Sequence, residues 1–171
     1  MNSTVQCLSR VKELKQALKS MQPPSAEELQ AAGGGLDPQT AFTLEGGKLM
    51  KDLEIKGFST PPAGFWNRLK QIHPVFAETT QQGHPKQQDA DECLGVILQN
   101  MRAPLKKANN DDDLIGNLFE IEMVSTSKCA EAPEEPPTTQ TENVFKLSCH
   151  IDNEANPIDQ LSDGLKFSLK G

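Results

Sequence analysis

The chain has 171 residues, enough for one domain with its own core, but hydrophobic residues make up only 36% and aromatic residues 5%, which predicts a modest core with long polar loops. The net charge of −7 argues against a nucleic-acid-binding domain, because phosphate contacts need clustered Lys and Arg, and it favours a basic partner. No apolar run approaches the length of a bilayer span, which excludes a transmembrane helix and a membrane partner.

The N-terminal segment predicts a helix followed by a loop. Residues 3–20 carry apolar side chains three or four positions apart, which is typical of a helix face. Ser3 and Gln6 fit a capping box at its start. A break is expected near residues 9–10. Residues 22–40 contain Pro-Pro and Gly-Gly-Gly runs and predict a loop.

Three longer helical patterns follow. The first covers residues 40–56 and is weakened by Gly46-Gly47, since glycine is a poor helix former. The second opens at Pro61-Pro62 and is stopped by Pro74. The third begins at residue 89 and turns Cys93 and the apolar residues after it inward, until Pro104 ends it.

Two acidic clusters precede helices. Asp89, Asp91 and Glu92 stand at a helix start, and residues 109–113 precede a short helix expected over 114–119. Asp89 fits an N-cap with Glu92 as the reciprocal partner three positions on, and the helix dipole favours Asp91. Acid–base catalysis by paired carboxylates is the alternative interpretation, and the spacing favours capping.

The C-terminal part changes from helix to strand. Residues 119–126 alternate apolar and polar side chains and predict a strand. Residues 131–142 are rich in Pro, Glu and Thr and predict a mobile loop. A second strand is expected over 144–151 and a helix over 159–170. The order of helices, then two strands, then a helix predicts an α+β fold.

The cysteines and histidines do not form a recognisable catalytic pair. No secretory signal follows Met1, so the four cysteines are expected to be reduced thiols in the cytosol or nucleus. Cys7 and Cys93 lie on apolar helix faces, where a free thiol usually serves packing. His73 and His84 lie at a helix end and in a loop, without neighbours that would orient a base.

A zinc site is also poorly supported. Structural zinc sites usually present Cys-x-x-Cys pairs, and Ala132 stands where Cys129 would need its partner. Cys129, Cys149 and His150 would converge if the two strands paired, but no fourth ligand is in evidence. We therefore expect neither a metal nor a cofactor.

The N-terminus resembles the ubiquitin-specific cysteine proteases. Residues 1–8, Met-Asn-Ser-Thr-Val-Gln-Cys-Leu, are similar to the tail of that family's cysteine box, which ends Gly-Asn-Thr-Cys-Tyr-Met-Asn-Ser and runs into a helix. Residues 11–18, Val-Lys-Glu-Leu-Lys-Gln-Ala-Leu, resemble the proteasome-associated branch in particular.

Three further segments carry the resemblance in the family's order. Residues 87–93, Gln-Gln-Asp-Ala-Asp-Glu-Cys, resemble that branch's Gln-Gln-Asp-Ala-Asn/Glu-Glu-Cys motif. Ile-Gly-Asn-Leu-Phe at 115–119, with Lys128-Cys129 downstream, is the next match. Leu-Ser-Cys-His-Ile at 147–151, followed by Gly-Leu-Lys at 164–166, is the last. The segment 22–40 matches no motif of the family.

The resemblance implies both a fold and an activity. Residues 1–118 would form the helical thumb, and residues 119–171 would begin the fingers and palm of an incomplete papain-like cysteine protease, with two strands, an acidic loop and a short helix. The implied reaction is hydrolysis of the isopeptide bond after the C-terminal glycine of ubiquitin, at the proteasome. The implied partners are ubiquitin or polyubiquitin conjugates and the proteasome.

The family pattern puts the catalytic groups outside this sequence. The nucleophilic Cys would lie two residues before Met1, with the oxyanion Asn upstream of it and the His downstream of Gly171, so the chain by itself is expected to be inactive. Because the strands lack most of their sheet, the isolated chain is also expected to be aggregation-prone or partly molten. The lone Cys129 resembles the branch that has lost the family's finger zinc.

The Gln-Gln-Asp segment is the candidate binding site. Carried over from the family, Gln87 and Asp89 would hydrogen-bond the backbone of ubiquitin's extended, basic C-terminal tail, with Gln88 beside them, and Asp89 would also face an Arg. Asp89 thus has two interpretations, helix cap and ligand, and one carboxylate has enough lone pairs for both. The alternative function is a non-catalytic ubiquitin- or proteasome-binding module; a helical adaptor unrelated to ubiquitin would require all the motif matches to be coincidence.

Overall fold

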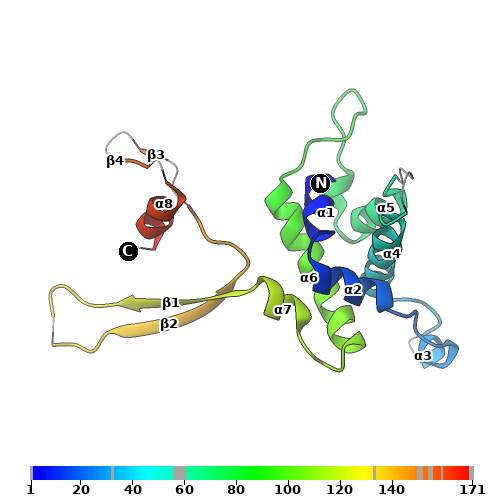
Figure 1. Ribbon diagram of the computed structural model, residues 1–171, viewed down its shortest axis with the longest axis horizontal. Coiled ribbons are helices and arrows are strands. Elements are labelled where there is room, and N and C mark those ends of the chain that lie inside the picture. The colour runs from blue at the N-terminus through cyan, green and yellow to red at the C-terminus, as the bar shows by residue number, and fades with distance from the viewer. Residues whose placement is uncertain are drawn as a thin grey trace. The chain divides into compact units, whose positions relative to one another are not determined.

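The computed structural model describes residues 2–31, 33–55, 61–132, 134–149, 152–153, 156–158 and 160–169. The chain divides into two compact units, residues 1–118 and residues 119–171. The first unit is helical and the second contains strands and one helix (Figure 1), which confirms the predicted α+β class. The assignment of the two units to a thumb and to the start of fingers and palm stays a prediction.

The first unit contains the helices whose packing makes the core. Within the described ranges, no helix is both long and apolar enough to cross a membrane. The elements are α1 (Asn2–Leu8), α2 (Lys12–Ser20), α3 (Ala26–Ala31), α4 (Pro38–Asp52), α5 (Ala63–Ile72), the 3-10 helix η1 (Pro74–Ala77), α6 (Ala90–Ala108) and α7 (Leu114–Phe119).

The expected break in the first helix is confirmed, but its cap is not. Residues 9–11 separate α1 from α2, and both helices bury their apolar faces. Because α1 already begins at Asn2, Ser3 lies inside the first turn, and the predicted capping box of Ser3 with Gln6 is wrong. Instead, the Gln6 backbone carbonyl accepts a hydrogen bond from the Ser9 hydroxyl at 2.7 Å.

The prediction of one loop over residues 22–40 is wrong, because α3 lies within it. The Ser25 hydroxyl accepts a hydrogen bond from the Glu28 N–H at 3.2 Å, and the Glu28 carboxylate accepts one from the Ser25 N–H at 2.7 Å. This reciprocal capping box holds a helix that buries no side chain. The next helix, α4, also begins two residues earlier than expected, with Pro38 in its first turn and Asp37 accepting from the Thr40 N–H at 2.9 Å.

The two glycines of α4 allow close helix packing. A Cβ atom on Gly47 would lie 2.3 Å from the backbone oxygen of Leu18 in α2. A Cβ atom on Gly46 would lie 2.8 Å from the terminal methyl carbon of Met101 in α6. The Gly-Gly pair that weakens α4 as a helix therefore lets α2 and α6 approach its backbone, and the three helices share one core (Figure 1).

The helix α6 runs past Pro104, where it was predicted to end. A proline inside a helix costs about 3 kcal/mol, because it lacks an N–H and its ring clashes with the preceding turn. The ring of Pro104 is buried, and Met101 and Leu105 on either side are each 1% exposed. Burying each such side chain contributes about 1.5–3 kcal/mol, which offsets the interruption.

An ion pair joins α6 to α7. The Arg102 guanidinium donates to both carboxylate oxygens of Asp113: Nε lies 3.1 Å from Oδ1 and 2.9 Å from Oδ2, and Nη2 lies 2.5 Å from Oδ2. The same carboxylate accepts a hydrogen bond from the Gly116 N–H at 3.1 Å, which makes Asp113 the cap of α7, the short helix expected after the acidic turn. Hydrogen bonding from Arg102 lowers the pKa of Asp113.

The second unit contains an antiparallel hairpin of β1 (Ile121–Ser127) and β2 (Thr138–Val144), in a register that pairs Ile121 with Val144 and Ser127 with Thr138. β1 is confirmed. The prediction of a loop over 131–142 and a strand over 144–151 is wrong: β2 lies earlier, and residues 145–149 are in neither helix nor strand, while 150–151 lie outside the described residues. Because β2 is exposed along most of its length, no apolar alternation marked it.

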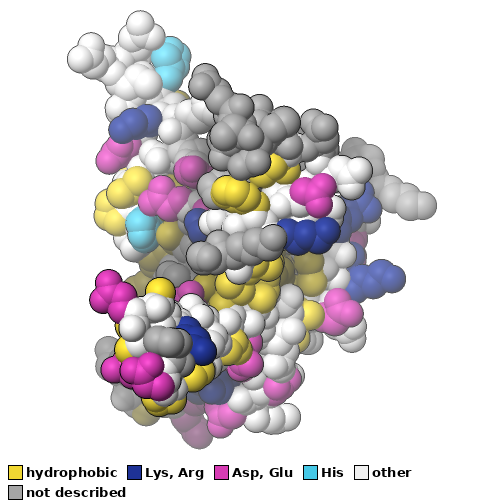
Figure 2. All heavy atoms as spheres, turned by 90° about the vertical axis from the view of Figure 1, so that its left-hand side faces the viewer, with side chains coloured by type: hydrophobic (Ala, Val, Ile, Leu, Met, Phe, Trp, Pro, Cys, Tyr) yellow, Lys and Arg dark blue, Asp and Glu magenta, His cyan; other side chains and the backbone are white. Residues whose placement is uncertain are grey.

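The second unit also contains short elements near its end. The strands β3 (Asp152–Asn153) and β4 (Asn156–Pro157) pair with each other, and α8 (Leu161–Ser168) lies within the range predicted for the last helix. Apolar side chains reach the molecular surface among charged ones, as the yellow areas in Figure 2 show. In this unit the large exposed ones are Ile121, Val124, Leu161, Phe167 and Leu169.

We predict that Gly47→Ala lowers the free energy of unfolding by about 2–3 kcal/mol, because α2 must move away from the new methyl group. The free energy of unfolding is measured by urea titration, with circular dichroism as the signal. The matched control is Gly95→Ala in α6, where a Cβ atom meets nothing within 4 Å. This control should stabilise the helix by up to about 1 kcal/mol. Equal effects of the two substitutions would contradict the close approach.

A second prediction concerns acid stability. Asp113→Ala should lower the free energy of unfolding by about 1–2 kcal/mol near neutral pH, through loss of the cap and of the Arg102 partner. Because the pKa of Asp113 is lowered in the folded state, its contribution is complete above the unfolded pKa of about 3.9 and disappears as the pH falls through the lower folded value.

The difference between the parent protein and Asp113→Ala should therefore shrink below about pH 4 in urea titrations at successive pH values. Asp111→Asn is the control, since it removes a charge from the same exposed turn and asparagine tolerates the positive φ of 64° found there. A difference between the parent and Asp113→Ala that stays constant with pH would refute the ion-pair account.

Candidate functional site

The predicted binding residues lie together in one open hollow at the N-terminal ends of α1 and α6. The hollow has a volume of about 520 Å³ and is lined by Asn2, Ser3, Lys86, Gln87, Gln88, Asp89 and Ala90. The sequence pattern identified three of these residues. It missed Asn2 and Ser3, because nothing in the sequence shows that the start of α1 and the start of α6 are neighbours. It also did not single out Lys86 and Ala90, which flank the Gln-Gln-Asp segment.

The hollow is assembled by contacts between α1 and α6. The Thr4 side chain is 6% exposed, and its hydroxyl lies 3.4 Å from the backbone oxygen of Ala90. Val5 and Leu8 are buried on the same side of α1. One face of a seven-residue helix is thus packed against α6, so the first turns of the two helices stay close together.

A hairpin-like turn delivers the Gln-Gln-Asp segment to α6. In this turn the Thr80 N–H donates a hydrogen bond to the His84 backbone oxygen at 2.8 Å, and the Lys86 N–H donates one to the Glu78 backbone oxygen at 2.9 Å. The side chains of Lys86 and Glu78 also form an ion pair at 3.0 Å. Gly83, with a φ of +79°, supplies the left-handed residue at the bend.

Asp89 caps α6, as predicted. Its Oδ1 atom accepts hydrogen bonds from the Asp91 N–H at 2.7 Å and from the Glu92 N–H at 3.4 Å. The reciprocal bond expected from Glu92 back to the Asp89 N–H is not found in the described part of the chain. Both cap bonds use one oxygen, so Oδ2 has no hydrogen-bond partner among the described residues.

The two glutamines have different environments. Gln88 is half-buried, and its Nε2 donates to the Val75 backbone oxygen at 2.8 Å, which fastens the segment to η1. Gln87 is exposed, and its side-chain amide makes no hydrogen bond to the described residues. The geometry therefore presents Gln87 and Asp89 to the hollow and uses Gln88 to hold them in place. Their contact with a ligand stays a prediction.

Of the two cysteines expected to pack, one does. Cys93 is fully buried, and this burial raises the pKa of its thiol, which keeps it protonated. Cys7 is exposed, so its predicted packing role is wrong. The buried face of α1 is formed by Thr4, Val5 and Leu8, and the break after Leu8 ends that face before it reaches Val11.

The histidines form no catalytic arrangement with these thiols in the described part. The ring of His73 lies against Phe76, with centroids 5.5 Å apart, and its buried Nδ1 finds no hydrogen-bond partner in the described ranges. His84 is exposed in the turn before the hollow, and His150 lies outside the described residues. Where the structure is described, no group of three or more His, Cys, Asp or Glu side chains is placed to hold a metal ion.

A family model and similar curated proteins indicate the same family for this chain. Residues 1–169 match the family model described as ubiquitin carboxyl-terminal hydrolase. Two similar curated proteins are ubiquitin carboxyl-terminal hydrolases 7 and 6 of Arabidopsis thaliana, which are 35% and 36% identical over 100% of this chain and 34% of each relative. Ubiquitin carboxyl-terminal hydrolase 6 of Schizosaccharomyces pombe is 29% identical over 88% of this chain and 28% of its own length.

The chain therefore spans about a third of the length of the two Arabidopsis relatives it matches. The match covers both units described above, and it includes the hollow at α1 and α6.

We predict that Asp89→Ala lowers the free energy of unfolding by about 1 kcal/mol, because the first turn of α6 loses its cap, whereas Asp89→Asn leaves it nearly unchanged. Thermal and urea unfolding of the two variants and the parent make the comparison. Equal losses in the two variants would mean that the charge of Asp89 stabilises the fold, and not its capping geometry.

Proposed function

Because the chain belongs to the ubiquitin carboxyl-terminal hydrolase family, we propose that it is part of a deubiquitinating cysteine protease and that the hollow at α1 and α6 binds the C-terminal tail of ubiquitin. The observation that carries this proposal is that Asp89 Oδ2 and the side-chain amide of Gln87 have no hydrogen-bond partner among the described residues, although both residues line the hollow. Both polar groups are exposed at a hollow lined by the start of α1.

An extended peptide fits these groups. Its backbone presents N–H and C=O groups that alternate in direction. The Gln87 amide can both donate to and accept from such a strand, and the Asp89 carboxylate can accept an N–H or pair with an arginine of a basic tail. The same carboxylate caps α6 through Oδ1, so the helix orients the ligand-facing Oδ2.

The reaction proposed for the whole protein is thiol-dependent hydrolysis. A thiolate at the start of α1 would be favoured by the unpaired N–H groups of the first helical turn. It would attack the carbonyl carbon of ubiquitin's last glycine, so that a thioester forms and the C–N bond to the leaving amine breaks while a histidine gives that amine its proton. Water would then hydrolyse the thioester, which releases the ubiquitin carboxylate and restores the thiol. We propose that this nucleophile and this histidine are not among these 171 residues; the burial of Cys93 and the absence of a His oriented toward a thiol in the described part of the chain support that view.

The proteasome-associated branch is the finer proposal. The Gln-Gln-Asp-Ala-Asp-Glu-Cys run at residues 87–93 supports it through resemblance. The same branch implies that the protein acts on polyubiquitin conjugates at the proteasome. Co-sedimentation of the complete protein with intact proteasomes is the measurement that decides this point, and sedimentation at the same rate with and without proteasomes would reject it.

We predict that Asp89→Asn, in a version extended upstream through the cysteine box and downstream to the histidine, lowers kcat/KM on a fluorogenic ubiquitin substrate about tenfold. Stability should stay unchanged, because asparagine retains the cap. Asp111→Asn, which removes one charge outside the hollow, should leave kcat/KM unchanged. A full loss in both variants would point to a general effect of net charge.

A labelling experiment distinguishes an enzyme from a non-catalytic binding module. Ubiquitin with a thiol-reactive group at its C-terminus should label the extended version and should not label the 171-residue chain. Labelling of the 171-residue chain would show that Cys7 or another of its thiols reacts, and our account of the nucleophile would be wrong. Tight ubiquitin binding by the extended version without labelling would favour a non-catalytic module.

A further inference from the structure

We propose that a second site, a pocket between α2 and α4, binds a bulky apolar side chain of an acidic peptide segment in a partner protein. This pocket has a volume of about 430 Å³ and shares no lining residue with the hollow that carries the proposed ubiquitin contact. A volume of this size is within the range of pockets that bind compact ligands.

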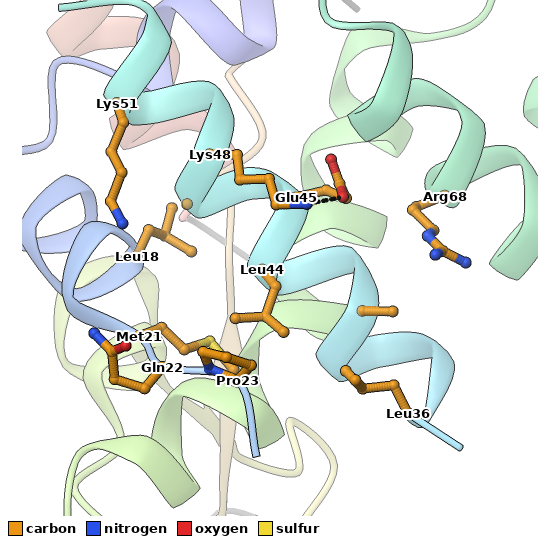
Figure 3. A pocket seen from close by; sticks show the side chains of 12 residues that line it. Leu18, Met21, Gln22, Pro23, Leu36, Leu44, Glu45, Lys48, Lys51 and Arg68 are labelled. Carbon is orange, nitrogen blue, oxygen red and sulfur yellow. Dashed lines mark hydrogen bonds and ion pairs between the residues drawn. The ribbon is translucent and has the colours of Figure 1, made fainter. Parts of the chain in front are cut away.

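The floor of the pocket is apolar. Leu44 of α4 points toward Met21 and Pro23, which follow the end of α2, and Leu36 closes one side (Figure 3). Leu36 is 37% exposed, and Leu44, Met21 and Pro23 are also partly or fully exposed to solvent. Covering this surface with a leucine or phenylalanine side chain would remove apolar area from water, which favours binding.

The rim of the pocket is positive. The charged residues that line it are Lys48, Lys51, Arg68 and Glu45, so the rim carries three positive charges and one negative charge, or +2, in a chain whose net charge is −7. The charge of this rim is therefore opposite to the net charge of the protein. It steers acidic segments to this surface and repels basic ones.

Two of the three cations have no carboxylate partner among the described residues. Lys48 is paired with Glu45 at 2.7 Å, as the dashed line in Figure 3 marks. Arg68 donates from Nη1 to the neutral side chain of Gln71 at 3.1 Å. Neither Arg68 nor Lys51 forms an ion pair with a carboxylate in the described ranges. These cations are therefore available to carboxylates of a peptide whose apolar side chain fills the floor.

One wall of the pocket comes from a segment outside the family motifs. Gln22, Pro23 and Leu36 belong to residues 22–40, which match none of the motifs that carry the resemblance. The site is thus separate from the ubiquitin-tail hollow in both residues and chemistry, since the hollow is proposed to meet a basic tail and this pocket an acidic segment. The inference does not depend on the proposed function.

The test uses the full-length protein, immobilised, and a phage-displayed library of random twelve-residue peptides. We expect selection of peptides with one Leu, Ile, Met or Phe flanked by Asp or Glu. A synthetic copy of the most enriched peptide should bind at least about tenfold more weakly to Arg68→Glu and to Lys51→Glu, and binding to the parent should weaken as salt is raised. Ala41→Trp, which fills the pocket from α4, should also abolish binding without changing any charge.

Two controls make the result decisive. Lys12→Glu reverses a charge on α2 outside the pocket and should change the affinity by less than about twofold. Asp89→Asn, in the other hollow, should have no effect. Melting curves check that each variant is folded. No enrichment, enrichment of basic or purely apolar peptides, or loss of binding in Lys12→Glu or Asp89→Asn as large as in Arg68→Glu would overturn the proposal.

Discussion

The contact of α2 with the backbone of α4 at Gly47 is the constraint on which the first unit depends. A Cβ atom there would come within 2.3 Å of the Leu18 backbone oxygen, so no other residue fits without separating the helices. Gly46 gives Met101 of α6 the same access on the neighbouring side of α4. With α2 and α6 both fixed against α4, the apolar faces of all three are buried together, and the long α6 tolerates an internal proline because its neighbours Met101 and Leu105 are buried.

This packing determines where the polar groups of the candidate site lie. The helix α6 is held by the core, and its first turn meets α1 through Thr4. Gln88 fastens the preceding segment to η1, so the positions on either side of it are restrained at the mouth of the hollow. The Oδ1 atom of Asp89 accepts the cap hydrogen bonds, and its Oδ2 atom has no hydrogen-bond partner in the described ranges. Cap and ligand are therefore not competing interpretations of Asp89, because the geometry accommodates both.

The second unit is stabilised differently from the first. Its hairpin is defined by backbone pairing between β1 and β2, and most of its side chains are exposed to solvent. A two-stranded hairpin in water is marginally stable when its faces are not covered. Ile121 and Val124, with 38% and 57% of their surface exposed, are apolar groups that burial against another surface would stabilise.

The sequence by itself determined the elements whose signal is local. Helix periodicity, the break after Leu8, the cap at Asp89 and the alternation in β1 all depend on residues a few positions apart, and the motif at residues 87–93 is enough to indicate the family. The capping box at Ser25 and Glu28 carried a local signal too, which the neighbouring Pro and Gly runs obscured. Tertiary structure alone decided the course of α6 past Pro104, the exposure of Cys7, the place of the exposed strand β2 and the meeting of α1 with the Gln-Gln-Asp segment. Each of these depends on which distant surfaces are buried together, and burial against a distant partner leaves no periodic trace in the chain.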